Sequence, residues 1–548
     1  VYYGNLPLLL IKNRKPSMAS KKKLQVWLPL ILSLCVVAGM FIGYRIRGNM
    51  PNNKSLFFID NQKPVQEVID LIQRKYVDTV NIDSLGNVAI ENILEGLDPH
   101  SVYIPYERLQ EINEDLEGVF FGIGIEFSII NDTTHTLRVI KGGPSDKAGL
   151  QTGDEFIKVG DSLVAGNHTT EATLKNLMRG KNGTKVTATI LRDGQLLVKE
   201  ITRGPVPIVS IDAAYMLNDT TAFIRISRFS ERTYKEFMTA MDTLQRQGMK
   251  SLILDLRDNG GGILNEAIYI ADEFLDGDKL ITYTIGAHTG RKDYKSSKEG
   301  IFEKGKLVVL INEGTASASE VLAGALQDWG RAEIVGRRSF GKGLVQEQYE
   351  LSDGSGLRLT VARYFTPVGR SIQRPYTEGT WAYYHDMITR FERGEMNSAD
   401  SINHKGEPQF LSKTGKVLYG GGGITPDVFV GVDNKSFERP IMRARIDGKI
   451  DRFVYYNFLN YKNEFRKYNN AFQFEKEYSA SEPELHHFKQ FLEKDSITLN
   501  LANTNQKIQA ASQIKMLTAR LIWGTQGYFE IKNYSDSTVL EALQVLKK

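Results

Sequence analysis

The chain has 548 residues, of which 41% are hydrophobic, 24% charged and 10% aromatic, and its formal net charge is +4. These proportions are typical of a globular protein and exclude a collagen, a low-complexity tail and a multi-span membrane protein. Residues 1–50 contain eight basic residues and no acidic residue, whereas the rest of the chain holds 61 basic and 65 acidic residues. The body is therefore mildly acidic, and its charge gives no reason to expect nucleic acid as a partner.

Residues 24–44 form an apolar run of 21 residues that is long enough to cross a bilayer as a helix. Three lysines precede the run, so we expect residues 1–23 to stay in the cytoplasm and the body to be exported. No small-residue cleavage site follows, which favours an uncleaved signal anchor over a cleaved signal peptide or a buried helix. Met18 is the expected natural start, with residues 1–17 upstream of it.

The only cysteine, Cys35, lies inside this apolar run. An intrachain disulfide is therefore impossible, and an exported body has to be stable through its hydrophobic core alone.

The pattern of apolar and polar residues changes several times along the body. Apolar residues at helical spacing predict helices over residues 65–76 and 88–97. Short β-rich runs follow, with a strand expected over residues 122–127 and a closing hairpin over residues 185–202. After residue 205, buried strands alternate with helices, an order typical of α/β layers around a largely parallel sheet. The expected division is a linker at 45–64, a helical region at 65–117, a β-rich domain at 118–204, an α/β core at 205–370 and 418–435, an insertion without clear period at 371–417 and a helical C-terminal region at 436–548.

A buried strand at residues 306–312 runs through a glycine-containing turn into a helix. Such a bend exposes a hydroxyl beside free backbone N–H groups, which are the donors that an oxyanion needs. Ser317 is the candidate nucleophile. The alternative is that Ser317 or Ser319 only caps the helix, with Glu320 completing a capping box. Thr315 and Ser319 also offer hydroxyls, and the local pattern leaves these choices open.

Two further glycine-rich segments follow strands. Residues 336–343 nearly match a P-loop, but Gly343 stands where the magnesium-binding Ser or Thr belongs, and a strand pattern follows instead of a helix. Nucleotide binding is therefore disfavoured, and a solvated lysine in a glycine turn is the plain alternative. Residues 254–262 end in three glycines, which suit a close approach of the backbone to a ligand or simply a left-handed turn.

A serine nucleophile needs a base. None of the eight histidines lies in a strand-end or glycine-turn context near these motifs, so no Ser-His-Asp triad is expected. A lysine can serve when burial lowers its pKa. Lys342, flanked by apolar residues, is the best candidate, and Gln346 lies on the same face of the extended stretch, where it could orient the amine.

In several motifs the chain resembles the carboxy-terminal processing (tail-specific) serine peptidases. The motifs GTASASE at residues 314–320 and GKGLVQ at residues 341–346 carry the resemblance. DLRDNGGG at residues 255–262 also matches, although Gly260 stands where Pro or Ser is more usual. Further matching segments are LDPHS at residues 97–101, GGITPD at residues 422–427 and residues 118–203, which resemble the PDZ domain of these enzymes.

The resemblance implies a multidomain α/β protein with a crotonase-like layered core and a Ser/Lys dyad. It implies that Ser317 is the nucleophile, that Lys342 is the general base and that Gln346 orients Lys342. Asp328 is expected to be structural. Backbone N–H groups of Ala318 and of Gly261 or Gly262 would form the oxyanion hole, and no metal or cofactor is implied. The PDZ segment would bind a substrate C-terminus through Phe121, Gly122, Ile123, Gly124 and Ile125.

The expected partners are proteins or peptides with accessible apolar C-termini and, through the N-terminal helix, the membrane. Homo-oligomerisation is possible by family precedent. The expected location is the bacterial inner membrane, crossed once, with the catalytic body on the periplasmic or extracytoplasmic side. The alternatives are a PDZ scaffold that binds C-termini without cleaving them and, less favoured, an ATPase.

Overall fold

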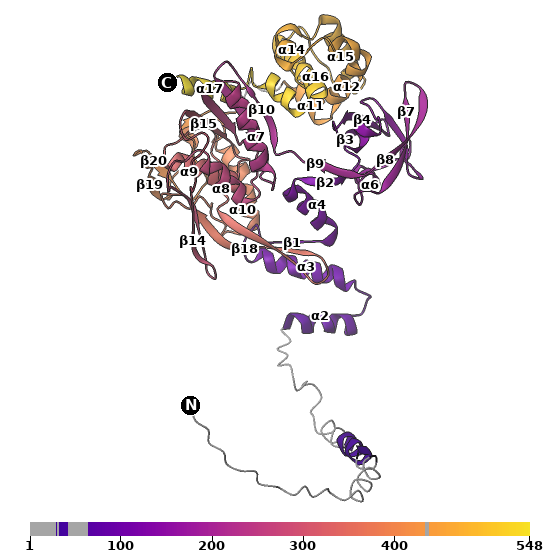
Figure 1. Ribbon diagram of the computed structural model, residues 1–548, viewed down its shortest axis with the longest axis vertical. Coiled ribbons are helices and arrows are strands. Elements are labelled where there is room, and N and C mark those ends of the chain that lie inside the picture. Colours follow the sequence, from indigo (N-terminus) through magenta and orange to yellow (C-terminus); the bar gives the residue numbers. More distant parts are fainter. Residues whose placement is uncertain (1–28, 30–31, 42–63, 433–437) are drawn as a thin grey trace, which may run out of the picture. The chain divides into compact units, whose positions relative to one another are not determined.

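The computed structural model describes residues 29, 32–41, 64–432 and 438–548, which fall into two compact units, residues 1–88 and residues 89–548. In the first unit, residues 32–41 are helical, and α2 (Pro64–Lys75) follows (Figure 1). In the described part of the chain no helix is long and apolar enough to cross a membrane. The rest of the expected span at 24–44, the cytoplasmic segment 1–23 and nearly all of the linker lie outside the described residues.

The second unit begins inside α3 (Ile82–Glu95), and a β-rich module follows α4 (Tyr106–Glu117). β2 (Val119–Gly122) pairs with β9 (Gly204–Pro207), and a second sheet has the order β3-β4-β5-β7-β8 with β6 beside β5. The prediction of one strand over residues 122–127 is wrong, because Gly124 has a φ of 75° and breaks it. The bounds are β3 (Ile125–Ile130), β4 (Thr133–Val139), α5 (Pro144–Lys147), β5 (Glu155–Val159), β6 (Ser162–Leu163), α6 (Glu171–Met178), β7 (Lys185–Arg192) and β8 (Gln195–Thr202).

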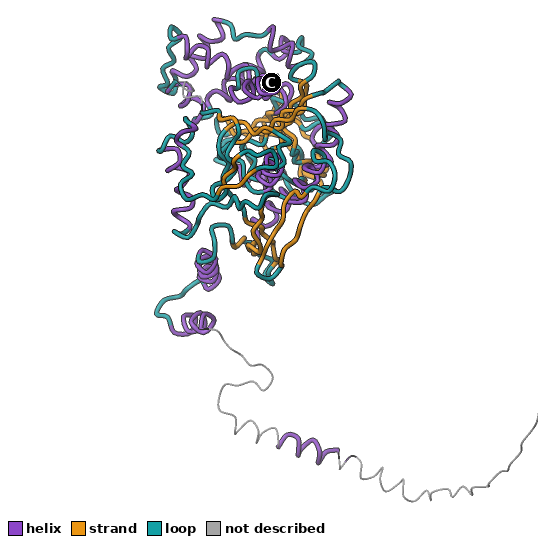
Figure 2. Tube along the Cα trace, turned by 90° about the vertical axis from the view of Figure 1, so that its left-hand side faces the viewer, coloured by secondary structure: helices purple, strands orange, loops and turns teal. Residues whose placement is uncertain are grey.

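A six-stranded sheet of order β10-β11-β12-β15-β16-β21 forms the centre of the core. Its neighbouring strands run parallel except for the antiparallel β10–β11 pair, as the alternation of strands and helices predicts. Figure 2 shows strands gathered between helical segments in this unit. The strands are β10 (Ile211–Met216), β11 (Thr221–Ile226), β12 (Ser251–Asp255), β15 (Lys306–Ile311), β16 (Glu333–Gly336) and β21 (Val428–Phe429).

Both faces of this sheet are buried, which explains its continuous apolar strands. One face packs against α7 (Thr233–Arg246), α8 (Leu264–Asp272) and α9 (Ala318–Asp328). The other face packs against α17 (Ser537–Lys547) through Val539, Ala542 and Leu546. The expected C-terminal region at 436–548 is therefore not one separate body, because its last helix completes the layers of the α/β core.

A smaller sheet lies beside the core and carries the segment after Lys342. β17 (Leu344–Glu350) pairs with β18 (Gly356–Phe365), and β18 also pairs with β1 (Val102–Ile104) and with β13 (Leu280–Gly286), which continues to β14 (Gly290–Lys295). Because β1 follows residues 97–101 directly, this pairing brings that early motif to the strands that follow Lys342.

The insertion at 371–417 contains a regular helix, α10 (Thr380–Glu392), which corrects the expectation that it has no period. A short η1 turn (Ala399–Ser401) and the pair β19 (Gln409–Leu411) and β20 (Val417–Tyr419) complete it. The remaining C-terminal helices form cores of their own: α11 (Arg439–Ile446), α12 (Lys449–Asn460), α13 (Lys462–Phe465), α14 (Ala471–Glu477), α15 (Glu482–Glu493) and α16 (Thr504–Lys532), whose Gly524 is non-helical.

Candidate active site

Ser317 lies at the sharp bend between β15 and α9. Its backbone has φ 57° and ψ −118°, a combination that residues other than glycine rarely adopt. Such a conformation persists only where the surrounding structure enforces it. The turn before it is held by Thr315, whose hydroxyl accepts a hydrogen bond from Asn312 N at 3.0 Å and donates to Leu256 O at 2.8 Å. Hydrogen bonds to residues that follow β15 and β12 therefore stabilise the strained bend.

Three hydroxyls were candidates in this turn, and the structure separates them. Thr315 and Ser319 are fully buried, and the Ser319 hydroxyl donates to Asn259 O at 3.0 Å. Ser317 is only half-buried. Thr315 and Ser319 thus hold the turn against the glycine-rich loop, and Ser317 is the one of the three that is left partly exposed.

The triple-glycine loop lies directly against Ser317. A Cβ added to Gly261 would lie 2.8 Å from Ser317 Cβ and 3.0 Å from Ala318 N, so no other residue fits there without displacing the serine. The Gly261 N–H already donates to Asn259 Oδ1 at 2.9 Å, which argues against the expectation that this group serves the oxyanion hole. Gly262 and Ala318, the first residue of α9, stay predictions for that role.

Glu320 joins the serine turn to the lysine turn. Its Oε2 accepts hydrogen bonds from Ser317 N at 2.9 Å and from Lys342 N at 2.8 Å. Its Oε1 accepts from Gly341 N at 2.8 Å and from the Ser339 hydroxyl at 2.5 Å. Burial raises the pKa of Glu320 to about 7, although these four donors oppose the shift. The capping box offered as the alternative for Ser317 and Glu320 is therefore present and is part of a wider bridge.

Tyr364 makes a second bridge between the same two turns. Its buried hydroxyl contacts Ser317 O at 3.0 Å and also Lys342 O. The backbones of Ser317 and Lys342 are thus bound to the same two side chains, although they come from different segments of the core.

Burial and the nearby charge of Arg358 lower the pKa of Lys342 to about 8, against the opposing charges of Glu320 and Asp98. The Lys342 amine donates to Gln346 Oε1 at 2.9 Å, as the shared face of the extended stretch predicts. Gln346 Nε2 in turn donates to His100 O. The Lys342 amine is therefore partly buried and of lowered basicity. Its partner Gln346 is fixed in turn by the hydrogen bond to His100 O.

His100 corrects the expectation that no histidine lies near these motifs. Its backbone carbonyl accepts the hydrogen bond from Gln346. Its ring packs edge-on against Tyr383 at 5.2 Å between centroids, and its Nε2 lies 2.9 Å from the Tyr383 hydroxyl. Burial lowers the pKa of His100 to about 4, and the Lys342 charge adds to the effect, so the imidazole is neutral near pH 7. Sequence reasoning missed this contact because His100 precedes Gln346 by 246 residues and reaches the site only through β1.

The insertion contributes an aromatic wall to the same place. The Arg374 guanidinium lies 4.0 Å from the ring centroids of both Phe340 and Tyr383, and it pairs with Asp386 at 3.1 Å. Both rings pack against the His100 ring, with centroids 6.5 Å and 5.2 Å away, so the wall shields the segment that binds Gln346. The aromatic density of residues 381–384 was the one sequence signal for this wall.

Asp255 and Asp328 form buried ion pairs within the core. Asp255, at the end of β12, pairs with Arg257 and Arg225 at 2.8 Å each, and although burial opposes it, these charges hold the pKa of Asp255 below its usual range. Asp328 pairs with the buried Arg370 at 2.6 Å, in agreement with its expected structural role.

The predicted C-terminus-binding segment joins β2 to an edge strand of the second sheet. Phe121 and Gly122 end β2, and Ile125 begins β3, an edge strand whose one neighbour in the described sheet is β4. Between them, the N–H groups of Ile123 and Gly124 have no acceptor within the described residues. Free N–H groups followed by an open strand edge are the features with which a sheet captures an extended peptide and its carboxylate.

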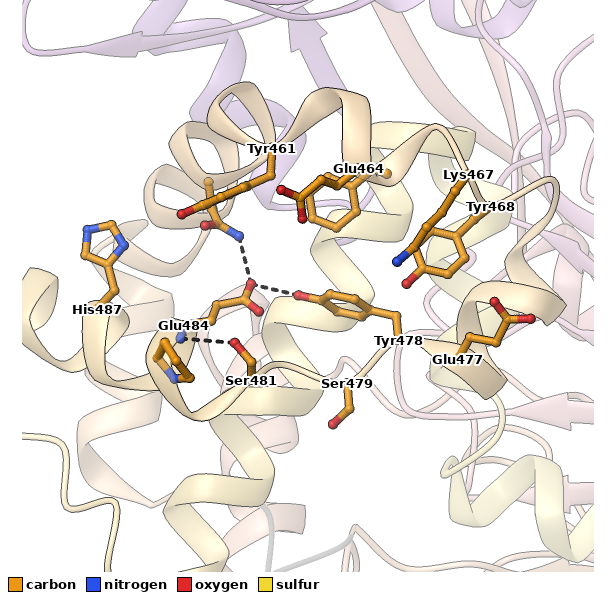
Figure 3. A pocket seen from close by; sticks show the side chains of 13 residues that line it. Tyr461, Glu464, Lys467, Tyr468, Glu477, Tyr478, Ser479, Ser481, Glu484 and His487 are labelled. Carbon is orange, nitrogen blue, oxygen red and sulfur yellow. Dashed lines mark hydrogen bonds between the residues drawn. The ribbon is translucent and has the colours of Figure 1, made fainter.

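A separate pocket of about 460 Å³ lies among the C-terminal helices (Figure 3). Tyr461, Tyr468, Tyr478 and several carboxylates line it, and Glu484 accepts hydrogen bonds from Tyr478 and Asn457 at 2.7 Å each. Its lining comes wholly from residues 457–487, so it includes no part of the Ser317 and Lys342 arrangement.

Comparison with known proteins gives the family. The profile of Peptidase family S41 matches residues 220–380, and that of a PDZ domain matches residues 122–202. "Carboxy-terminal processing protease CtpA" of Bacillus subtilis (strain 168) is 32% identical over 357 residues, 65% of this chain and 76% of that protein. "Carboxy-terminal-processing protease" of Bartonella bacilliformis is 34% identical over 313 residues, 56% of this chain and 71% of that protein.

Among solved structures, "Photosystem II D1 C-terminal processing protease" aligns over 68% of this chain and 88% of that chain, with 26% identity and a TM-score of 0.34. From the profiles and the curated relatives, the chain is a serine peptidase of family S41 that carries a PDZ domain. It belongs to the carboxy-terminal processing peptidases.

Proposed function

We propose that the protein is a membrane-anchored endopeptidase that binds substrate C-termini through its PDZ domain and hydrolyses peptide bonds with a Ser317/Lys342 dyad. The observation that carries the proposal is the double bridge: Glu320 and Tyr364 each bind the backbones of both Ser317 and Lys342. A PDZ scaffold that does not cleave would have no use for a strained serine beside a lysine of lowered pKa.

In the proposed reaction, the neutral Lys342 amine takes the proton from Ser317 Oγ as this oxygen attacks the scissile carbonyl. The carbonyl oxygen gains the negative charge, which the Ala318 and Gly262 N–H groups would stabilise. The lysine then gives its proton to the leaving amine, and the C–N bond breaks. Water, deprotonated by the same lysine, attacks the acyl-serine ester and releases the new C-terminus while Ser317 regains its proton.

The pH profile follows from the lysine. Because the base has to be neutral and the pKa of Lys342 is lowered to about 8, we expect kcat/KM to fall about tenfold per pH unit well below pH 8 and to level off above it. Arg358→Gln removes a positive charge that lowers this pKa, so the acid limb should move to higher pH. Rates measured from pH 5.5 to 10 check both statements.

The matched control is Arg363→Gln, an exposed arginine on the same strand β18. It should leave the midpoint of the limb where it is. A limb that stays fixed in Arg358→Gln, or moves equally in both variants, contradicts the assignment of the titrating group to Lys342.

Tail recognition predicts a dependence on the substrate carboxylate. Amidating the C-terminus of an apolar-tailed peptide substrate removes the charge that the Ile123 and Gly124 N–H groups would bind, so KM should rise about tenfold with little change in kcat. Acetylating the N-terminus of the same peptide is the control and should change neither constant. Equal KM values for the amidated and free peptides would argue against tail capture.

The proposed anchor rests on the apolar run at 24–44 and the lysines that precede it. With the N-terminus in the cytoplasm, the peptidase body would act on the periplasmic or extracytoplasmic side of a bacterial inner membrane. Recovery of the full chain in the soluble fraction of lysed cells would contradict this part of the proposal.

A further inference from the structure

Helix α10 of the insertion exposes an apolar stripe. Trp381 is 75% exposed, Tyr384 51%, Ile388 50% and Phe391 62%. At 3.6 residues per turn these four side chains lie within an arc of roughly 80°, whereas the buried Tyr383 and Arg390 lie on the opposite side of the helix.

This arrangement is unusual for a helix at a protein surface. A helix packed on a core normally turns its polar face to water. Here the buried side carries an arginine, and the exposed side carries three aromatic residues and an isoleucine. Contiguous exposed apolar side chains of this size mark an interaction surface.

The stripe continues onto the segment that precedes His100. The Tyr384 hydroxyl donates to Pro99 O at 2.9 Å, and its ring lies 6.5 Å from the His100 ring. Leu97, two residues before Pro99, is 56% exposed, and Ile93, one turn earlier, is 56% exposed as well. Exposed apolar side chains therefore occur both on α10 and on the segment that leads to its contact at Pro99.

Hydrogen bonds connect this stripe to the proposed site of the reaction. Pro99 is followed by His100, whose carbonyl receives the Gln346 amide, and Gln346 holds the Lys342 amine. Tyr384 thus ties the stripe to the segment that orients the proposed base. A chain that enters this site in an extended form has to pass nearby, and an unfolded polypeptide exposes apolar side chains as it does so.

We infer that the α10 stripe (Trp381, Tyr384, Ile388 and Phe391) is a docking surface for apolar side chains of the unfolded substrate next to the scissile bond. From Tyr384 to Phe391 the stripe is about 10 Å long, which matches about three residues of extended chain. This inference rests on the proposed Ser317/Lys342 site and adds to it a preference for substrates that are apolar beside the cleavage point as well as at the C-terminus.

The test uses the full chain in lipid nanodiscs and the double variant Ile388→Ser/Phe391→Ser, which spares Tyr384 and its contact with Pro99. The control is Leu411→Ser/Val417→Ser, two residues of the same insertion that are 63% and 54% exposed. With reduced and carboxymethylated α-lactalbumin as substrate, we expect KM to rise about tenfold in the stripe variant at unchanged kcat, and neither constant to change in the control. Hydrolysis of p-nitrophenyl acetate should be the same in all three proteins.

An unchanged KM in a stripe variant with wild-type circular dichroism and Tm overturns the inference. So does a change of the molar mass in solution or of binding to protein-free vesicles at unchanged KM, because a second copy or a lipid surface would then be the occupant. Should the double variant fail to fold, Phe391→Ser replaces it with the same readouts. Ester hydrolysis that survives Ser317→Ala would instead contradict the proposed Ser317/Lys342 site. This readout distinguishes a failure of that site from a failure of the docking surface.

Discussion

Replacing Ser317 by alanine should reduce kcat for peptide hydrolysis by about 10⁴-fold or more, because the nucleophilic oxygen is lost while the fold and the PDZ domain stay intact. Lys342→Ala should reduce it by a similar factor, since the two residues act as one unit. Binding of an apolar-tailed peptide, measured by fluorescence anisotropy, should be unchanged in both variants.

Ser319→Ala is the matched control for the nucleophile. This serine is two residues away on the same turn, but its hydroxyl is fully buried and donates to Asn259 O. Its loss removes one hydrogen bond, about 1 kcal/mol, so we expect less than a tenfold fall in kcat. If Ser319→Ala loses most of its kcat while Ser317→Ala stays active, Ser319 and not Ser317 would be the nucleophile.

The second large effect is expected at Glu320. Glu320→Gln keeps the size of the side chain but sets an NH₂ donor against backbone N–H groups that now donate to the carboxylate, those of Ser317, Gly341 and Lys342. Leaving buried donors unsatisfied costs about 1–3 kcal/mol each. We expect kcat to fall at least about 100-fold and the free energy of unfolding to drop by about 2–4 kcal/mol, measured by peptide hydrolysis and urea denaturation.

Glu333→Gln gives the comparison, because this glutamate forms a half-exposed ion pair with Lys416. Such pairs contribute about 0–1 kcal/mol, so neither activity nor stability should change much. If Glu320→Gln behaves like Glu333→Gln, the bridge between the serine and lysine turns does not hold the site together.

Much of the core could be predicted from local sequence. The closing hairpin expected over residues 185–202 is formed by β7 and β8, and the strands expected after residue 205 form the largely parallel sheet, because both patterns are local and periodic. The contact of Lys342 with Gln346 was also predictable, since both lie on one extended stretch and alternate residues share a face.

The features that sequence reasoning missed depend on contacts between distant segments. His100 reaches Gln346 only because β1 pairs with β18, and Tyr383 reaches His100 only because the insertion folds back over the site. The engagement of the Gly261 N–H by Asn259 is a side-chain contact within a loop, which no periodicity reports. Likewise, α17 joins the core sheet although more than a hundred residues of other helices and insertions precede it.

The most direct test of the proposed dyad is the rate of Lys342→Ala against an unfolded protein substrate across pH 6 to 10. The protein should retain the folded state and peptide binding of the wild type but show no more than about 10⁻⁴ of its rate, without the acid limb near pH 8. A Lys342→Ala protein that cleaves at the full wild-type rate, with the same limb, would contradict the assignment of Lys342 as the base.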